Sequence, residues 1–148
     1  MDLEYTVEDC LLIDIPTFSD ERGIISVLDK ELPFEVKRVF WLYHISEGKN
    51  RGAHALLHGS EIMISLHGSF VVDLFDGGKE VSIPLNNPGK GLLIRPGIWF
   101  ATHSYKEDGV SLILASEEYA RERYTYDYNE YLQLRECQCL HQKDGGHR

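Results

Sequence analysis

The chain has 148 residues, of which 43% are hydrophobic and 26% are charged, and its formal net charge is −9. This length suits one domain that buries its own core, and no apolar run approaches the roughly 18 residues that a membrane span needs. The negative charge argues against a nucleic-acid partner, which would require a clustered basic face.

The beginning of the chain and its cysteines predict a cytoplasmic location. The first residues, "MDLEYTVEDC", are acidic and lack the basic and apolar stretches of a targeting segment. Cys10, Cys137 and Cys139 are odd in number, and two of them crowd near the C-terminus, which is not a disulfide framework. We therefore expect reduced thiols and no membrane association.

Short segments in which apolar and polar residues alternate predict β-strands along the first 116 residues. The predicted strands are residues 36–45, 61–66, 69–75, 80–85 and 109–116. "HGS" at 67–69, "DGGK" and "NNPGKG" predict turns between the middle strands. This pattern is typical of an all-β sandwich or barrel.

The end of the chain has a different character. Residues 116–137 contain five tyrosines but no glycine or proline, which is compatible with a short helix or two packed on the barrel through aromatic faces. The last residues are polar. We expect a single domain over 1–134 and a mobile polar tail over 135–148.

The segment "RGAHALLHGSE" at 51–61 carries the first candidate site. If residues 54–58 are extended, His54, Leu56 and His58 face one side, with the histidines about 6 to 7 Å apart. An apolar neighbour would lower a histidine pKa by desolvation and keep a neutral imidazole available as a base. The alternative is a core His54 and a surface His58 without a chemical role.

A metal site of the kind found in small β-barrels would need a His-x-His pair, a glutamate and a later histidine. Here those places hold His54, Leu56, Glu61 and Phe100, so two of the four are apolar. A first-row metal requires at least three protein ligands. We therefore predict no metal and no other cofactor.

Three arginines accompany the segment at 51–61. Arg51 starts it, Arg38 lies in the predicted strand before it, and Arg95 comes shortly before Trp99 and Phe100. Arginine beside aromatic residues suits a diphosphate and a stacked base. The alternative is that these are solvated charges at strand ends.

These residues, in this order, resemble the cupin-fold sugar-nucleotide 3,4-ketoisomerases that act on dTDP-4-keto-6-deoxyglucose and include the WxcM-like domain. The resemblance is nearly free of gaps from about Asp20 to Tyr131. The matching segments are "DERGIISV", "LPFEVKRVFWLYHI", "RGAHA", "HGSFVV", "DG" at 76–77, "GLLIRPGIW", "LASEEY" and "YTYDYNEYL".

The resemblance implies a small cupin or jelly-roll barrel with a short C-terminal helical segment, which forms a homodimer and binds a dTDP-linked keto sugar without metal. The implied reaction moves a ketone from C4 to C3 through an enediol. In the family this work is attributed to two histidines after Arg-Gly. His54 falls on the first position and Leu56 on the second, while Phe100 replaces a later histidine.

Three accounts of Leu56 remain open. His58 takes over the missing role, His54 acts alone, or the chain is a nucleotide-sugar-binding domain without isomerase activity. The predicted catalytic residues are His54 and His58. The predicted substrate contacts are Arg51, Arg38, Tyr43, Glu61, Arg95, Trp99, Phe100 and His103.

Overall fold

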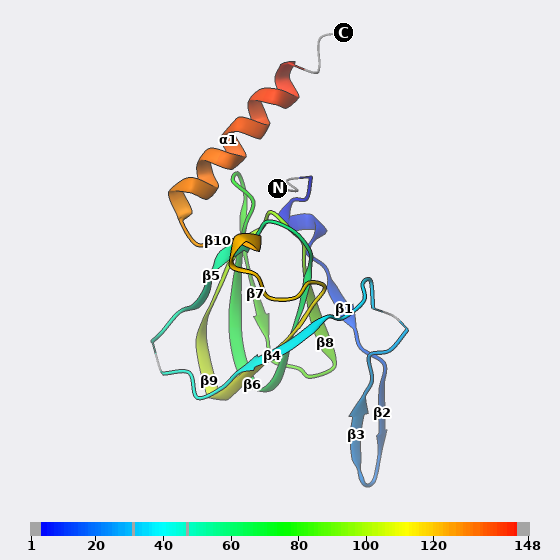
Figure 1. Cartoon of the computed structure of the whole chain (residues 1–148). Helices are drawn as coiled ribbons and strands as arrows, with labels where there is room; N and C mark the ends of the chain where they lie inside the picture. The colour runs from blue at the N-terminus through cyan, green and yellow to red at the C-terminus, as the bar shows by residue number, and fades with distance from the viewer. Residues whose placement is uncertain (1–3, 31, 47, 145–148) are drawn as a thin grey trace.

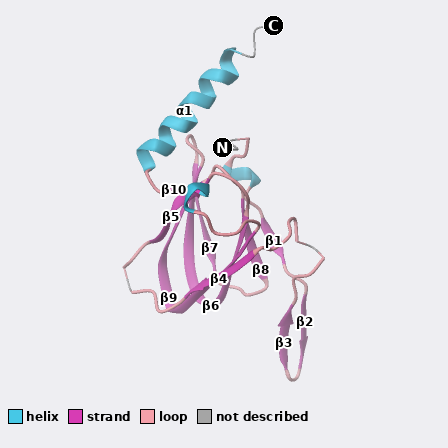
Figure 2. Cartoon of the chain, viewed as in Figure 1, coloured by secondary structure: helices cyan, strands magenta, loops and turns pink. Residues whose placement is uncertain are grey.

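The computed structural model describes residues 4–30, 32–46 and 48–144, with side chains up to residue 137. Its antiparallel sheet curls into a small cupin-type barrel, with a helix at the C-terminus (Figure 1). Figure 2 shows strands throughout the middle of the chain. The elements are a 3-10 helix Val7–Asp9, β1 Leu12–Asp14, β2 Thr17–Asp20, β3 Gly23–Ser26, β4 Arg38–Leu42, β5 Arg51–Leu56, β6 Glu61–Phe75, β7 Glu80–Leu85, β8 Lys90–Ile94, β9 Trp99–Ala115, a 3-10 helix Arg121–Arg123, β10 Tyr124–Thr125 and α1 Tyr128–Asp144.

The two longest strands, β6 and β9, pair along most of their length. The turn predicted at 67–69 is wrong, because β6 continues through these residues and register shifts between Ser65 and Val71 mark a bulge. Gly68 has a φ of 62°, and a Cβ there would lie 2.3 Å from the carbonyl oxygen of Lys106. Glycine at this position therefore permits the close approach of β9.

The bulge exchanges the two faces of β6, because an irregular pairing shifts the alternation of side chains. Before the bulge, Met63 belongs to the core inside the barrel, while Ile62 and Ile64 belong to a second core on the outer face. After it, Phe70 and Val72 face the interior. The sheet is thus buried on both sides near the start of β6, which places Glu61 on the inner face with Met63.

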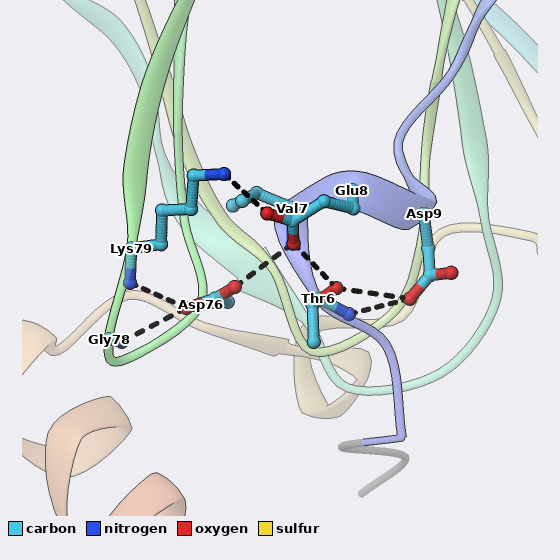
Figure 3. Close-up of polar contacts among 7 residues, drawn as sticks. All are labelled: Thr6, Val7, Glu8, Asp9, Asp76, Gly78 and Lys79. Carbon is cyan, nitrogen blue, oxygen red and sulfur yellow. Dashed lines mark hydrogen bonds and ion pairs between the residues drawn. The ribbon is translucent and has the colours of Figure 1, made fainter.

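The N-terminal 3-10 helix is tied to the turn between β6 and β7 (Figure 3). The Asp76 carboxylate accepts hydrogen bonds from the backbone N–H groups of Val7 at 3.0 Å, Gly78 at 3.0 Å and Lys79 at 2.8 Å. The Lys79 ammonium pairs with Glu8. These contacts fix the first described residues against this turn.

The β2–β3 hairpin projects from the barrel (Figure 1). Its strands pair only with each other, and all of their residues are exposed. The exposed fractions of Phe18, Ile24 and Ile25 are 66%, 70% and 64%. A two-stranded hairpin of this kind has little stability by itself in water.

The segment between β9 and α1 is mostly irregular, and the helix begins at Tyr128, inside the 116–137 range whose composition is compatible with a short helix. It then continues through residue 134, so the predicted domain boundary lies inside the helix. Buried Tyr131 anchors α1 by donating its hydroxyl to the carbonyl oxygen of Gly97 at 2.7 Å. No helix in the described part of the chain is long and apolar enough to span a membrane.

Candidate active site

The imidazole of His54 lies in a cage of aromatic rings. His54 on β5 stands directly opposite Phe100 on β9, and their ring centroids are 4.6 Å apart. The rings of Tyr124 and Tyr126 lie 5.1 Å and 5.5 Å from the imidazole. His54 is therefore half-buried among aromatic rings. On its Phe100 side, the neighbouring ring cannot exchange a proton with the imidazole.

A pocket opens beside this histidine. Its volume is about 370 Å³, which falls within the range of small-molecule sites. The lining is mainly aromatic, with one cation and one imidazole, and it comes from β4, β5, β10 and the segments on both sides of β10. The lining residues are Arg38, Phe40, His54, Tyr119, Tyr124 and Tyr126.

His54 is neutral at physiological pH. Burial, and secondarily the positive charge of Arg38, lower its pKa from 6.5 to about 4. No hydrogen bond within the described residues contributes to this shift. The neutral imidazole therefore keeps a lone pair for a proton of a bound molecule.

Arg38 connects the pocket to a buried carboxyl group. Its guanidinium donates a hydrogen bond to the hydroxyl oxygen of Tyr124 and lies 3.5 Å from Oε1 of Glu61. The same guanidinium stands over the Phe40 ring, 4.8 Å from its centroid. These contacts hold the cation at the wall of the pocket.

Glu61 is the most deeply buried acidic side chain of this region, with 2% of its surface exposed. Burial raises its pKa to about 7, although the charge of Arg38 opposes this. Its Oε1 atom has no hydrogen-bond partner among the described residues. Glu61 therefore acts on the pocket through Arg38, by electrostatic attraction across 3.5 Å.

Comparisons with known proteins agree with this architecture. A family model described as "FdtA: WxcM-like, C-terminal" matches residues 8–136. A TDP-4-oxo-6-deoxy-alpha-D-glucose-3,4-oxoisomerase of Aneurinibacillus thermoaerophilus is 30% identical over 122 residues, which cover 81% of this chain and 88% of the relative.

Solved structures give the same result. A 3,4-ketoisomerase from Helicobacter canadensis is 33% identical, with a TM-score of 0.83 over 86% of this chain and 98% of that one. The sugar 3,4-ketoisomerase QdtA of Thermoanaerobacterium thermosaccharolyticum, in complex with TDP, is 28% identical, with a TM-score of 0.86 over 90% and 98% of the two chains. A histidine-to-asparagine variant of QdtA, in complex with TDP-4-keto-6-deoxyglucose, is 28% identical, with a TM-score of 0.84 over 86% and 94%.

The chain belongs to the WxcM-like sugar-nucleotide 3,4-ketoisomerase family. Within this ketoisomerase, the pocket beside His54 is the candidate active site, because it combines an ionisable group, a cation and aromatic walls in one concave surface.

The second histidine predicted for catalysis lies outside this pocket. β5 ends at Leu56, which is 4% exposed and belongs to the barrel core, and the next backbone N–H, that of Leu57, donates to the carbonyl oxygen of Arg123. His58 is exposed and does not line this pocket; it lines an adjoining small cleft that shares Arg38 and Tyr124 with the pocket. The expected extension of the strand to His58 fails because the chain turns after Leu56.

Two residues of the predicted site lie on the outer face of the sheet. Trp99 pairs with Ala55, one position from the pair of His54, so it faces the opposite side of the sheet and packs against Tyr131 of the ketoisomerase's helix at 5.5 Å. His103 lies 2.8 Å from the Asp73 carboxylate on that outer face.

Of the remaining predicted contacts, Arg95 stands over the ring of Tyr5, 5.1 Å from its centroid, and does not line the pocket. Tyr43 is exposed after the end of β4. Arg51 is exposed at the start of β5, three residues before His54. The structure therefore brings together His54, Phe100, Arg38 and Glu61, with Arg51 exposed on the strand that carries His54. The other predicted residues lie apart from this group.

Sequence reasoning missed the tyrosines that form much of the pocket. Tyr124 and Tyr126 alternate around Thr125, which is the spacing of two side chains on one face of an extended segment. The composition of residues 116–137 indicated a helix instead, so this spacing was not interpreted as an extended segment. Phe40, on the inner face of β4, was also missed as a pocket residue.

No group of three or more histidine, cysteine or acidic side chains suited to a metal occurs within the described ranges. His54 and Glu61, the two potential ligands of the cupin-like pattern, have Leu56 and Phe100 in the other two places, and both of these are buried. The donor set in this pocket therefore does not fit a resident metal ion.

Proposed function

We propose that this ketoisomerase moves the ketone of a TDP-linked 4-keto-6-deoxyhexose from C4 to C3 in the cytoplasm. The observation that carries the proposal is the neutral imidazole of His54 at the wall of a pocket of about 370 Å³. The relatives named for this reaction support the substrate class. Because the ketone and the hydroxyl only exchange places between adjacent carbons, proton transfers suffice and no cofactor is needed.

His54 is the proposed base. Its imidazole removes the proton from C3, which creates an enediol between C3 and C4, and the same group returns a proton to C4. A pKa of about 4 makes the imidazole a weak base but keeps it unprotonated throughout the physiological range. The bound sugar would pack against the aromatic walls formed by Tyr124 and Tyr126.

We assign the diphosphate to Arg51. Its side chain is exposed on the strand that carries His54, and a guanidinium binds phosphate oxygens in a forked geometry. Arg38 is less suited to this role, because its guanidinium is already engaged by Tyr124 and Glu61.

The proposal is tested by incubating the protein with TDP-4-keto-6-deoxyglucose in deuterated water and following C3 and C4 by NMR. We expect formation of the 3-keto sugar with deuterium at C4, and loss of this exchange in His54→Asn. His58→Asn is the matched control and should retain activity, since His58 does not line the pocket beside His54. Tight TDP binding without any exchange would support a nucleotide-sugar-binding domain instead.

We further propose that two copies of the chain form a homodimer through the outer face of the barrel. The exposed hairpin residues Phe18, Ile24 and Ile25 lie next to an apolar groove of about 760 Å³, to which Ile24, Leu66 and Leu112 contribute. A second copy would bury both surfaces, which is the usual outcome for a large exposed apolar patch.

Light scattering tests the dimer. At micromolar concentration we expect a mass of about twice the 17.0 kDa of one chain. The double variant Phe18→Ser/Ile25→Ser should shift the mass toward a monomer, because both side chains are more than half exposed in one copy. A monomeric unmodified protein would contradict the proposal.

A further inference from the structure

The proposed reaction needs a second proton-exchanging group near the sugar oxygens. As C3 loses its proton, negative charge develops on the oxygen at C4, and a donor at that oxygen lowers the barrier. Among the residues that line the pocket, Arg38 keeps its protons at all relevant pH values. The candidates besides His54 are therefore three tyrosines, Tyr119, Tyr124 and Tyr126.

We propose that Tyr124 is this second catalytic group, which protonates the oxygen at C4 and then accepts the proton of the hydroxyl at C3. This inference rests on the proposed isomerase function. It assigns to one phenol the role for which neither Leu56 nor His58 is placed.

The strand pairing puts Tyr124 beside Leu56, the position that corresponds to the second histidine of the family. In the antiparallel ladder between β10 and β5, Tyr124 stands directly opposite Leu56. Directly opposite residues project from the same face of a sheet, with Cβ atoms about 4.5 to 5.5 Å apart. His54, two residues before Leu56, projects from that face as well, and the rings of His54 and Tyr124 lie 5.1 Å apart. A substrate in the pocket therefore meets both groups.

The hydrogen bond from Arg38 prepares the phenol to donate. The guanidinium donates to the hydroxyl oxygen of Tyr124, so that oxygen is the acceptor and the phenolic hydrogen remains available to the pocket. Burial raises the pKa of Tyr124, which keeps the proton on the phenol in the resting protein. When the proton leaves, the adjacent guanidinium stabilises the phenolate that forms.

Buried Glu61 helps to hold the guanidinium of Arg38 in place beside Tyr124. The carboxyl group of Glu61 lies 3.5 Å from the guanidinium and is itself almost completely buried. The guanidinium also lies 5.5 Å from the ring centroid of Tyr119, but the hydroxyl to which it donates is that of Tyr124. Tyr119 and Tyr126 are 64% and 52% exposed, whereas Tyr124 is half-buried. Water competes least for the hydroxyl of Tyr124, where an electrostatic interaction is strongest.

The proton transfers balance in two halves. First, His54 takes the C3 proton, the C–H electron pair forms the C3–C4 double bond, and the C4 oxygen takes the proton of Tyr124 to give an enediol. Next, the C3 hydroxyl returns a proton to the phenolate, its electrons form the C3 carbonyl, and C4 takes the proton from the imidazolium. Both residues end in their starting states, and no oxidant or other reactant is consumed.

Tyr124→Phe tests the role, with Tyr128→Phe, at an exposed tyrosine that does not line the pocket, as the matched control. The first variant removes one hydroxyl but keeps the ring that packs on His54. With TDP-4-keto-6-deoxyglucose, we expect kcat to fall about 100-fold or more in Tyr124→Phe and less than about 5-fold in the control. The dissociation constant for TDP and the circular dichroism spectrum should match those of the unmodified protein in both variants.

The outcomes separate the two levels of the proposal. If the unmodified protein is active and Tyr124→Phe retains kcat within about 3-fold, Tyr124 is not the proton donor although the isomerase function stands. If the unmodified protein shows no turnover and no C3 exchange, the proposed function falls and the role of Tyr124 falls with it. A variant with weakened TDP binding but normal kcat would assign the hydroxyl to substrate binding and overturn the inference.

Discussion

Replacing Glu61 with glutamine should make the stability of the protein rise from pH 5 to pH 8. The carboxyl group has a pKa of about 7 in the folded chain, compared with 4.5 for an ordinary glutamate. Between these values the folded state binds more protons than the unfolded state, so Glu61 makes the protein less stable as pH rises. His54 has the opposite effect, because its pKa of about 4 lies below the ordinary 6.5.

The two effects are similar in size and nearly cancel. From pH 5 to pH 8, the shift of Glu61 removes about 2.5 kcal/mol of unfolding free energy, on the basis of about 1.4 kcal/mol per pKa unit. Over the same range the shift of His54 adds about 2 kcal/mol. As far as these two groups are concerned, the unmodified protein has an almost flat profile. Glu61→Gln should therefore gain about 2 kcal/mol from pH 5 to 8.

Urea unfolding at pH 5, 6, 7 and 8, followed by tryptophan fluorescence, measures these profiles. His54→Asn should show the opposite trend and lose about 2.5 kcal/mol from pH 5 to 8. Glu80→Gln, which changes an exposed glutamate, is the control and should follow the unmodified protein. Identical slopes for Glu61→Gln and the unmodified protein would refute the assignment of a buried, proton-retaining carboxyl at Glu61.

Three further substitutions test other parts of the structure. Leu56→His should raise kcat by less than about 10-fold, because position 56 is buried in the core and Tyr124 is proposed to do the second proton transfer; a larger gain in a steady-state assay would show that Leu56 had disabled the site. Gly68→Ala should lower the unfolding free energy by about 2 kcal/mol or more, since its φ is positive and its Cβ would meet the β9 backbone. Gly78→Ala is the control and should be tolerated; equal melting temperatures of the two variants would contradict the bulge. Trp99→Ala should destabilise the protein by about 2 kcal/mol through lost packing on α1 and leave the KM for the TDP-sugar unchanged. A rise of KM by more than about 10-fold would show that Trp99 contacts the substrate.

The local sequence pattern was sufficient to predict those features that depend on residues close together in the chain. Alternation predicted the strands on either side of the β6 bulge, and the Arg-Gly-x-His segment marked His54, which does line the pocket. It was not sufficient where two segments must meet. "HGS" at 67–69 has the composition of a turn, but its pairing with β9 makes it a bulge, and that pairing involves residues about 40 positions away.

The sequence by itself determined an all-β barrel, a single family of relatives and one histidine of the site, because side-chain periodicity and short motifs are local properties of a chain. Only the tertiary structure decided what surrounds that histidine. The pairing of β10 with β5 places Tyr124 opposite Leu56, and the pairing of both β4 and β6 with β9 at Ala115 places Arg38 near Glu61. Those contacts, and the burial that shifts the pKa values of His54 and Glu61, arise from packing between segments far apart in the chain.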